Sequence, residues 1–146
     1  MKHELVLDWM AKDVITVTPT ATLKEAEQLL IDNTVRRLPV VTAGRLVGIV
    51  TYGDIRAARP SPAQALTPAA IDALAEKLTV AEFMTPNPLT IAYDESIGVA
   101  ARLMLKNMIS GLPVVNRQGE LMGIITEADI LRLVIHEWSR EIASAG

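Results

Sequence analysis

The chain has 146 residues, enough for a compact body with a sizeable core, and half of them are hydrophobic, which excludes an intrinsically disordered protein. The net charge of −3 gives no electrostatic footprint for nucleic acid, and the lack of cysteine excludes disulfides and thiolate chemistry. No apolar run approaches the roughly 20 residues of a membrane span, and residues 1–5 lack the apolar core of a secretory signal. We therefore expect a soluble cytoplasmic protein that binds neither nucleic acid nor a membrane.

An internal repeat accounts for most of the sequence, because residues 6–56 match residues 80–131, with one extra residue in a turn of the second copy. The copies share Leu-Pro-Val-Val at 38–41 and 112–115, a turn glycine at 44 and 119, and Thr-x-x-Asp at 51–54 and 126–129. A repeat of this length is a folding unit rather than a solenoid element. The expected domains are a first repeat at 1–58, a linker with a short helix at 59–78, and a second repeat with an extended C-terminal helix at 79–146.

The first repeat is predicted to run helix, strand, helix, strand, strand, helix. Its opening helix follows from apolar residues that recur at helical spacing over residues 5–10. Thr22 and Glu25 form a capping box before the next helix. The expected elements are a strand at 15–17, a helix with the buried stripe Leu23, Ala26, Leu29 and Leu30, strands at 38–41 and 46–50 around a turn at 42–45, and a helix capped by Thr51.

The linker is predicted to end in a packed helix, because Thr67 and Pro68 read as an N-cap followed by a proline at the first helical position. Prolines at 60 and 62 punctuate the segment before it. The apolar face of this helix is expected to hold Ile71, Leu74 and Leu78.

The second repeat has the same order of elements, opened by a capping box of Thr79 and Glu82. Ser96 is expected to cap a helix, and the last helix runs from Glu127 to about Ala143. The strands are expected at 89–91, 112–115 and 121–125, with a hairpin over 117–120 and a buried helix stripe of Ile97, Ala100, Ala101, Met104 and Met108. The predicted fold class is α+β, with two pseudo-symmetric repeats that are each a small three-stranded sheet packed with helices.

The ordered pattern of hydrophobic-Pro-Val-Val, a glycine turn, hydrophobic-x-Gly-Ile-hydrophobic and Thr-x-x-Asp resembles the CBS domain, named for cystathionine β-synthase. Two such domains in tandem resemble a Bateman module, and the resemblance covers the chain from the opening helix to about Arg132. The insert between the copies is similar to that of the bacterial acetoin-utilisation-type CBS proteins. Each element alone is common, whereas the ordered set occurring twice is specific.

The resemblance implies a regulatory module. Such modules bind adenosine-containing ligands in the cleft between the two repeats and signal to a regulated partner protein. The candidate ligands are AMP, ADP, ATP, S-adenosylmethionine and NAD, and the sequence does not choose among them. No cofactor is expected to be required.

Thr51 and Asp54 lie where a strand is followed by a helix, as do Thr126 and Asp129 in the second repeat. Free backbone N–H groups at that point, together with the helix dipole, suit a phosphate. An ionised aspartate is an acceptor only, so it can take both hydroxyl groups of a ribose. The same residues also suit a simple helix cap, and the resemblance favours ligand contacts in at least one copy.

The resemblance also implies contacts with the base, from the first short strand and from the segment before Pro39 or Pro113. Thr16 and Thr90 in those strands are equally ordinary β-branched strand residues. The first repeat offers two arginines that can bind phosphate or stack on a base, although they can equally be a solvated surface pair. The candidate ligand-binding residues are Thr16, Arg36, Arg37, Pro39, Thr51, Asp54, Thr90, Ser110, Gly111, Pro113, Thr126 and Asp129.

Glu127 distinguishes the two Thr-x-x-Asp motifs, because an anion beside a phosphate site lowers affinity unless a cation offsets it. Arg132 and His136 on the last helix are candidates for that cation, or are simple surface residues. Tyr52 in the first motif carries no such penalty. The first repeat is therefore expected to prefer a phosphorylated ligand, and the second to take a less charged nucleoside or to stay empty.

No catalytic or metal-binding pattern is evident. His3 and His136 do not have metal-ligand spacing, and there is no nucleophile–base pair or dinucleotide fingerprint. We expect a ligand sensor rather than an enzyme. The alternative is a structural dimerisation or interaction module with non-functional pockets, and a third possibility is a small enzyme, which would need a convergent acid–base pair.

The last helix predicts assembly into a homodimer. Its apolar residues recur every four positions, at Ile130, Val134, Trp138 and Ile142. Trp138 and Ile142 lie beyond the repeated unit and would leave an exposed apolar strip on a monomer. A two-fold homodimer would bury Trp138 between helices, whereas in the alternative the tail folds back onto Leu74 and Leu78 of its own linker helix.

Overall fold

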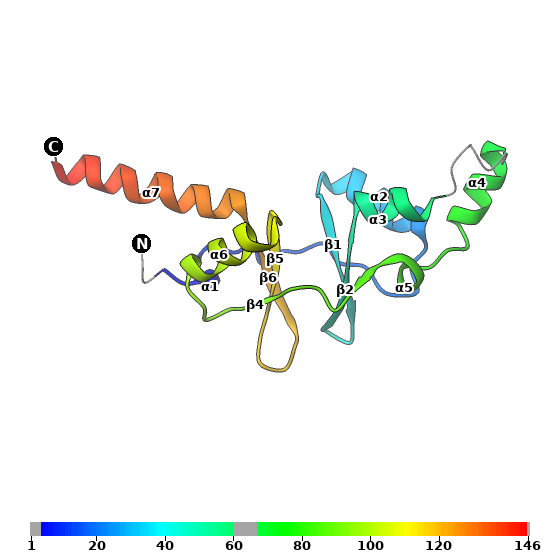
Figure 1. Cartoon of the computed structure of the whole chain (residues 1–146), viewed down its shortest axis with the longest axis horizontal. Coiled ribbons are helices and arrows are strands. Elements are labelled where there is room, and N and C mark those ends of the chain that lie inside the picture. Colours follow the sequence, from blue (N-terminus) through cyan, green and yellow to red (C-terminus); the bar gives the residue numbers. More distant parts are fainter. Residues whose placement is uncertain (1–3, 60–66, 146) are drawn as a thin grey trace. The chain divides into compact units, whose positions relative to one another are not determined.

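The computed structural model describes residues 4–59 and 67–145 as a mixture of helices and short strands (Figure 1). The helices are α1 (Val6–Trp9), α2 (Leu23–Asn33), α3 (Tyr52–Ala58), α4 (Pro68–Ala75), α5 (Val80–Phe83), α6 (Ile97–Asn107) and α7 (Glu127–Ala145). The strands are β1 (Arg37–Thr42), β2 (Arg45–Thr51), β3 (Thr85–Pro86), β4 (Ile91–Ala92), β5 (Gly111–Val115) and β6 (Leu121–Thr126). His3 and the linker prolines at 60 and 62 lie outside the described residues. Among the described helices, none has both the length and the apolar character needed to cross a bilayer.

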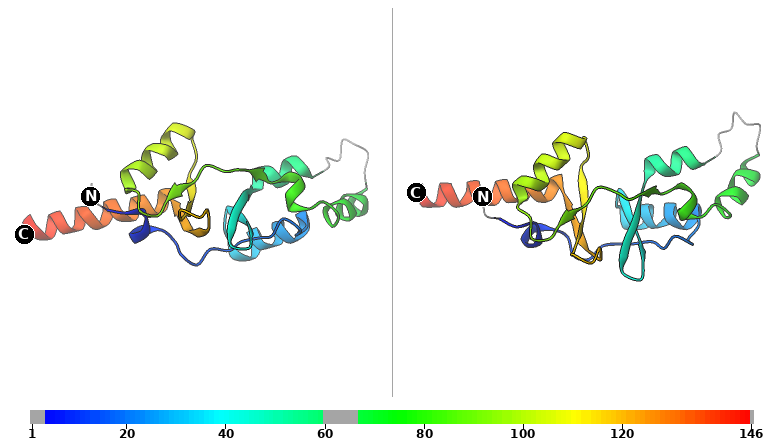
Figure 2. Two further views of the ribbon diagram at one scale, coloured as in Figure 1. Left: turned by 90° about the horizontal axis from the view of Figure 1, so that it is seen from below. Right: turned by 60° about the horizontal axis from the view of Figure 1, so that its bottom comes forward.

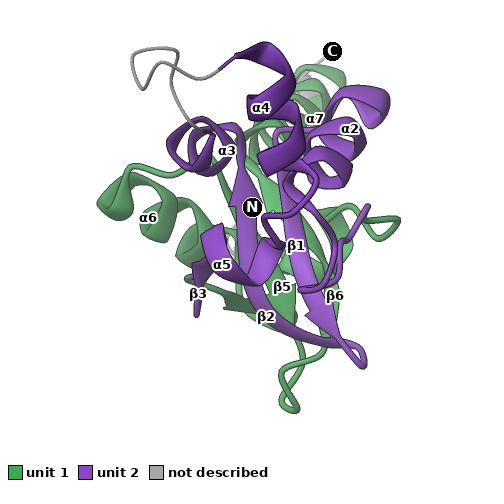
Figure 3. Cartoon of the chain, turned by 90° about the vertical axis from the view of Figure 1, so that its right-hand side faces the viewer, with its two compact units in different colours: residues 1–14, 89–146 green, residues 15–88 purple. Residues whose placement is uncertain are grey.

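The chain forms two compact units, each with a three-stranded sheet, so the predicted α+β class is confirmed (Figure 3). Unit 1 combines Met1–Val14 with Leu89–Gly146, and unit 2 is Ile15–Pro88. The units therefore do not coincide with the sequence repeats. The opening helix of the first repeat, α1, belongs to unit 1, and the opening helix of the second repeat, α5, belongs to unit 2.

The exchanged helices are held by backbone hydrogen bonds. In unit 1 the Val6 N–H donates to the Glu95 carbonyl at 2.9 Å, and the Ala11 N–H donates to the Ile124 carbonyl of β6 at 2.8 Å. In unit 2 the Val80 N–H donates to the Ala21 carbonyl at 2.8 Å. Each repeat thus supplies an element that completes the unit built mainly from the other repeat.

The sheet of unit 2 has the order β1-β2-β3 with antiparallel pairing. Its hairpin turn has positive φ at both central residues, 50° at Ala43 and 82° at Gly44, as a two-residue turn of this kind requires. The strand expected at 15–17 is a single parallel bridge from Val17 to Val40, in which the Val17 N–H donates to the Pro39 carbonyl at 3.0 Å. The first short strand of the repeat is therefore only a point of contact.

The sheet of unit 1 has the order β4-β5-β6, with β4 parallel to β5 and β6 antiparallel to it. The strand expected at 89–91 is observed as Ile91–Ala92. The longer turn of this hairpin contains Gly119 with a φ of 81°, and the Asn116 side chain accepts from the Gln118 and Glu120 N–H groups at 3.0 and 2.9 Å. The extra residue of the second copy is accommodated in this turn.

A glycine in each sheet allows the exchanged segment to lie directly against it. A Cβ atom on Gly123 would lie 2.5 Å from the Ala11 carbonyl oxygen, and one on Gly48 would lie 2.5 Å from the Met84 sulfur. Both distances are far below ordinary contact. The glycine of each hydrophobic-x-Gly-Ile pattern therefore makes room for the other repeat's opening segment.

Each unit has its own hydrophobic core, and most of the predicted helix stripes face it. Of the stripe in α2, Leu23, Ala26 and Leu30 are buried and Leu29 packs at the edge of the core. Of the stripe in α6, Ile97, Ala100 and Met104 are buried. The inclusion of Met108 was wrong, because this residue terminates α6 in a left-handed conformation and its side chain is 93% exposed.

The linker helix α4 begins as predicted, with the Ala70 N–H donating to the Thr67 hydroxyl at 3.1 Å and Pro68 at the first helical position. Its buried residue is Ala75, and Leu78 packs against the unit 2 core. Leu74, which was expected on the buried face, is 38% exposed. The helix ends at Ala75, so Leu78 lies beyond its last turn.

Helix α7 has 19 residues, and its first part packs on the core of unit 1. Leu133 is fully buried and Ile130 packs at the edge of the core. The C-terminal part of the helix, drawn in red, extends beyond the sheet and α6 of unit 1 (Figures 1 and 2). Trp138 and Ile142 on that part are 64% and 60% exposed.

Candidate ligand-binding sites

The Thr-x-x-Asp motif of unit 2 forms a reciprocal cap at the start of α3. The Asp54 N–H donates to the Thr51 hydroxyl at 3.3 Å, and the Asp54 carboxylate accepts from the Thr51 N–H at 2.9 Å and from the Thr51 hydroxyl at 3.1 Å. All three of these contacts leave the second carboxylate oxygen, Oδ1, unused. That oxygen accepts a hydrogen bond from the Thr85 hydroxyl at 3.0 Å.

The motif of unit 1 makes two of the same contacts at the start of α7. The Asp129 carboxylate accepts from the Thr126 N–H at 2.8 Å and from the Thr126 hydroxyl at 3.1 Å. Its Oδ1 accepts from the Arg132 guanidinium at 3.0 Å. Arg132 therefore pairs with Asp129, and the expectation that Arg132 offsets Glu127 is replaced by this contact. His136 instead lies against Trp9, with ring centroids 5.7 Å apart.

Sheet register brings the predicted base-side segments next to these motifs. In unit 2, Arg37 pairs with Thr51 across β1 and β2, and Pro39 pairs with Ile49. The Val17 N–H donates to the Pro39 carbonyl of β1, and Thr16 directly precedes Val17 in the sequence. The first repeat's candidates therefore gather along one end of the unit 2 sheet, where Thr16 and Arg36 are exposed and Pro39 is buried.

The corresponding segments of unit 1 meet in the same register. Gly111 pairs with Thr126, Pro113 pairs with Ile124, and the Glu127 N–H donates to the Ser110 carbonyl at 3.0 Å. Thr90 directly precedes β4, which pairs with β5. Gly111 and Pro113 are both buried, so they shape the site through the backbone.

The two aspartates differ in their access to a ligand. Asp129 is 4% exposed and carries an arginine on its outer oxygen, whereas Asp54 is partly exposed and carries a neutral hydroxyl. An ionised carboxylate has about four lone-pair sites, so Asp54 can keep its cap and still accept from a ribose hydroxyl. The arrangement in unit 2 therefore suits ribose binding better than that in unit 1.

Thr85 contacts a candidate site residue, Asp54, and was not itself among the candidates predicted from the sequence. It belongs to the second repeat in the sequence but lies in β3, beside β2 of unit 2. Its counterpart in the first repeat is Ala11, which has no hydroxyl. The signal that the sequence offered was the hydroxyl group at one of these two aligned positions.

Within residues 4–59 and 67–145, no group of three or more acidic, histidine or cysteine side chains is placed to hold a metal ion. Within each motif, the threonine hydroxyl instead donates a hydrogen bond to the aspartate carboxylate. These sites offer hydrogen-bond acceptors and backbone donors to an organic ligand.

The repeats match a known family. Residues 6–61 and 80–136 each match the CBS domain. A CBS domain-containing protein of Dictyostelium discoideum is 38% identical over 135 residues, which cover 90% of this chain and 91% of that protein. Protein MJ1225 of Methanocaldococcus jannaschii is 34% identical over 133 residues, and there the match spans only 47% of the relative's length.

Solved structures share the fold over nearly the whole chain. CBSX2 of Arabidopsis thaliana, in complex with AMP, is 29% identical with a TM-score of 0.76, and the match covers 91% of this chain and 97% of that one. The CBS domain pair of protein MJ0100, in complex with 5′-methylthioadenosine and S-adenosyl-L-methionine, is 36% identical with a TM-score of 0.73, over 91% and 97%. AcuB from Vibrio cholerae, named for acetoin utilization, is 29% identical with a TM-score of 0.79, over 95% and 96%.

Proposed function

Because the chain belongs to the CBS domain family, we propose that it is a regulatory module that binds an adenosine-containing ligand and signals its presence to a partner protein. CBSX2 and the MJ0100 domain pair, with the same paired fold, are complexes with AMP and with S-adenosyl-L-methionine and 5′-methylthioadenosine. ADP, ATP and NAD share the adenosine group and remain candidates. The module itself carries out no reaction, although related domains occur in enzymes such as an inosine-5′-monophosphate dehydrogenase, of which the match spans 24%.

The geometry of Asp54 carries the proposal. Its carboxylate is held rigidly by the Thr51 N–H and hydroxyl, is partly exposed, and retains acceptor capacity for ribose hydroxyl groups. Thr16, Arg36, Arg37 and Pro39 lie along the same end of the sheet and supply the base and phosphate contacts. In unit 1 the corresponding set is Thr90, Ser110, Gly111, Pro113, Thr126 and Asp129.

A thermal-shift panel tests this function directly. A ligand that binds only the folded state stabilises it by about 2.7 kcal/mol when present at 100 times its dissociation constant. We expect at least one of AMP, ADP, ATP, S-adenosylmethionine, 5′-methylthioadenosine and NAD to raise the melting temperature, with guanosine monophosphate as the base-specificity control. A folded protein that none of these ligands stabilises would instead be an interaction module with non-functional pockets.

A further inference from the structure

The outer oxygens of the two motif aspartates have different partners. In unit 2 the Asp54 Oδ1 accepts from the neutral Thr85 hydroxyl at 3.0 Å. In unit 1 the Asp129 Oδ1 accepts from the Arg132 guanidinium at 3.0 Å, in an ion pair within α7. The residue aligned with Arg132 in the first repeat is Ala57, which has no charge. The two sites therefore differ in whether a cation contacts the outer oxygen of the carboxylate proposed to hold the ribose.

The Arg132 side chain can reach a ligand as well as Asp129. It is 62% exposed, whereas Asp129 is buried. A guanidinium carries five N–H donors in a planar fork, and it can bind phosphate oxygens through two of them at once. A ligand whose ribose binds Asp129 must therefore share the carboxylate with Arg132 or displace the guanidinium from it.

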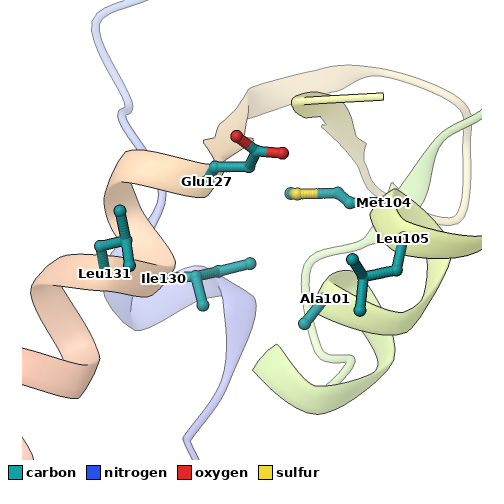
Figure 4. A pocket seen from close by; sticks show the side chains of 6 residues that line it. All are labelled: Ala101, Met104, Leu105, Glu127, Ile130 and Leu131. Carbon is teal, nitrogen blue, oxygen red and sulfur yellow. The ribbon is translucent and has the colours of Figure 1, made fainter. Parts of the chain in front are cut away.

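Glu127, the acidic residue expected to disfavour a phosphate in this unit, lies on another side of the helix. Its side chain lines the pocket between α6 and α7, together with Met104 and Ile130 (Figure 4). At 3.6 residues per turn, Glu127 and Asp129 are about 160° apart around α7, whereas Asp129 and Arg132 are about 60° apart. The charge that contacts the Asp129 carboxylate is therefore positive, and the charge of Glu127 acts on the site only from the far side of the helix.

Building on the proposed function, we infer that Arg132 sets the charge preference of the unit 1 site by binding the phosphate of a 5′-nucleotide whose ribose is held by Asp129. The phosphate of such a ligand is attached to the same ribose ring as the hydroxyl groups, so one guanidinium can adjoin both. An anionic ligand gives Arg132 a new partner in place of the carboxylate, whereas an uncharged ligand only competes with it. This preference is between ligands at one site and is independent of which site fills first.

AMP and 5′-methylthioadenosine measure this preference, because both are 5′-substituted adenosines and only AMP carries a phosphate. Calorimetric titrations in an Asp54→Asn background observe the unit 1 site. Arg132→Gln keeps side-chain N–H donors without the charge. It should lower the preference for AMP by at least about tenfold, the lower end for a hydrogen bond to a charged group. Arg132→Lys keeps the charge and should retain more of the preference than Arg132→Gln.

Arg140→Gln is the matched control. Arg140 lies on the same helix, is 66% exposed, and forms the same kind of i,i+3 ion pair, with Glu137 at 3.3 Å. Its substitution should leave the preference for AMP unchanged. A purely structural effect of Arg132→Gln would weaken both ligands alike and leave their ratio as it was, and circular dichroism checks that each variant is folded.

Ionic strength gives a second measure of the same contact. Added salt screens charge pairs, so it should weaken AMP binding more than 5′-methylthioadenosine binding in the Asp54→Asn protein. Arg132→Gln should reduce this difference. A salt dependence that Arg132→Gln leaves unchanged would contradict a contact between Arg132 and the phosphate.

An unaltered ratio of the two affinities in Arg132→Gln, or an equal fall in Arg140→Gln, would overturn the inference. So would a unit 1 site that binds 5′-methylthioadenosine as tightly as AMP, or a loss of all binding in the Asp54→Asn background. These outcomes leave the proposed function standing. A wild-type protein that no adenosine compound stabilises would instead contradict the proposed function itself, and the role of Arg132 with it.

Discussion

Asp54 has two roles at the level of the single residue. One oxygen closes the cap of α3 through the Thr51 N–H and hydroxyl, and the other receives the Thr85 hydroxyl. Removing the side chain therefore removes a helix cap as well as the proposed ribose acceptor. The two effects can be separated, because asparagine keeps an acceptor oxygen for the cap but has no charge.

Asp54→Asn should weaken binding of the adenosine ligand by about 1.5–3 kcal/mol, the range for a hydrogen bond to a charged group. Asp54→Ala should lose the same affinity and in addition about 1 kcal/mol of folding stability through the lost cap. Calorimetric titration and chemical denaturation measure the two quantities. Unchanged affinity in a folded Asp54→Asn variant would reduce this residue to a capping role.

Thr85→Val should weaken ligand binding by about 0.5–1.5 kcal/mol, which is less than the loss of a direct hydrogen bond to a charged group. The reason is that the Thr85 hydroxyl holds Asp54 Oδ1 at 3.0 Å but has no need to touch the ligand itself. The comparison is with Asp54→Asn in the same titration. A loss as large as that of the aspartate variant would show direct ligand contact, and no loss would show that the hydroxyl does not position the carboxylate.

At the level of the elements, Gly48 of β2 and Gly123 of β6 allow the exchanged segments to pack closely against the two sheets. Gly123→Ala should destabilise the protein by roughly 1–3 kcal/mol, because its Cβ would lie 2.5 Å from a backbone oxygen of Ala11. Gly48→Ala should be milder, since the nearest atom is the sulfur of Met84 on a flexible side chain.

Gly98→Ala is the matched control for the glycine series. Its nearest neighbour would be the Ser96 hydroxyl at 3.8 Å, and alanine favours the helix by up to about 1 kcal/mol. Urea denaturation gives the order of the three variants. A Gly123→Ala variant as stable as Gly98→Ala would mean that Ala11 and β6 can move apart without loss of stability.

Most elements could be predicted from hydrophobic period and capping residues, and the exceptions have physical causes. Met108 continues the apolar period of α6, but the helix ends there in a left-handed residue, which side-chain pattern does not encode. Leu74 was expected on the buried face because it shares helical spacing with Ile71 and Leu78, whereas the residue that α4 buries is Ala75, and the helix ends there. The spacing of apolar residues predicts the buried face of a helix only where the helix continues and the elements packed against it are known.

The Thr-x-x-Asp geometry was also predictable, because both partners lie within one turn of one helix. Thr85 and Arg132 were not. Thr85 reaches Asp54 through the pairing of β2 with β3, and that pairing depends on which unit the second repeat's opening segment joins. Arg132 forms its ion pair with Asp129 and not with Glu127, and this depends on side-chain geometry within α7. A sequence comparison that treats each repeat as a separate folding unit cannot predict contacts between residues of different repeats.

For the whole molecule, the two sites should fill unequally. Asp129 is 4% exposed with Arg132 on its outer oxygen and Glu127 nearby in sequence. Asp54 is partly exposed, and Arg37 pairs with Thr51 of the same motif across β1 and β2. Titration with AMP to saturation should therefore resolve a tighter and a weaker class. Asp54→Asn should remove the tighter class and Asp129→Asn should leave it, so the reverse result would contradict this ranking.

The exchange of opening helices also affects the order in which the two units can fold. Unit 2 is one continuous stretch, Ile15–Pro88, whereas unit 1 joins the first residues of the chain to the last part. Domains generally fold as units while a chain is being synthesised. Unit 2 can therefore be complete before β6 exists, but Ala11 must wait for Ile124, with Val6 and Met10 uncovered until then. Val6, Met10 and Ala11 are therefore synthesised before unit 2 but reach their native neighbours after it.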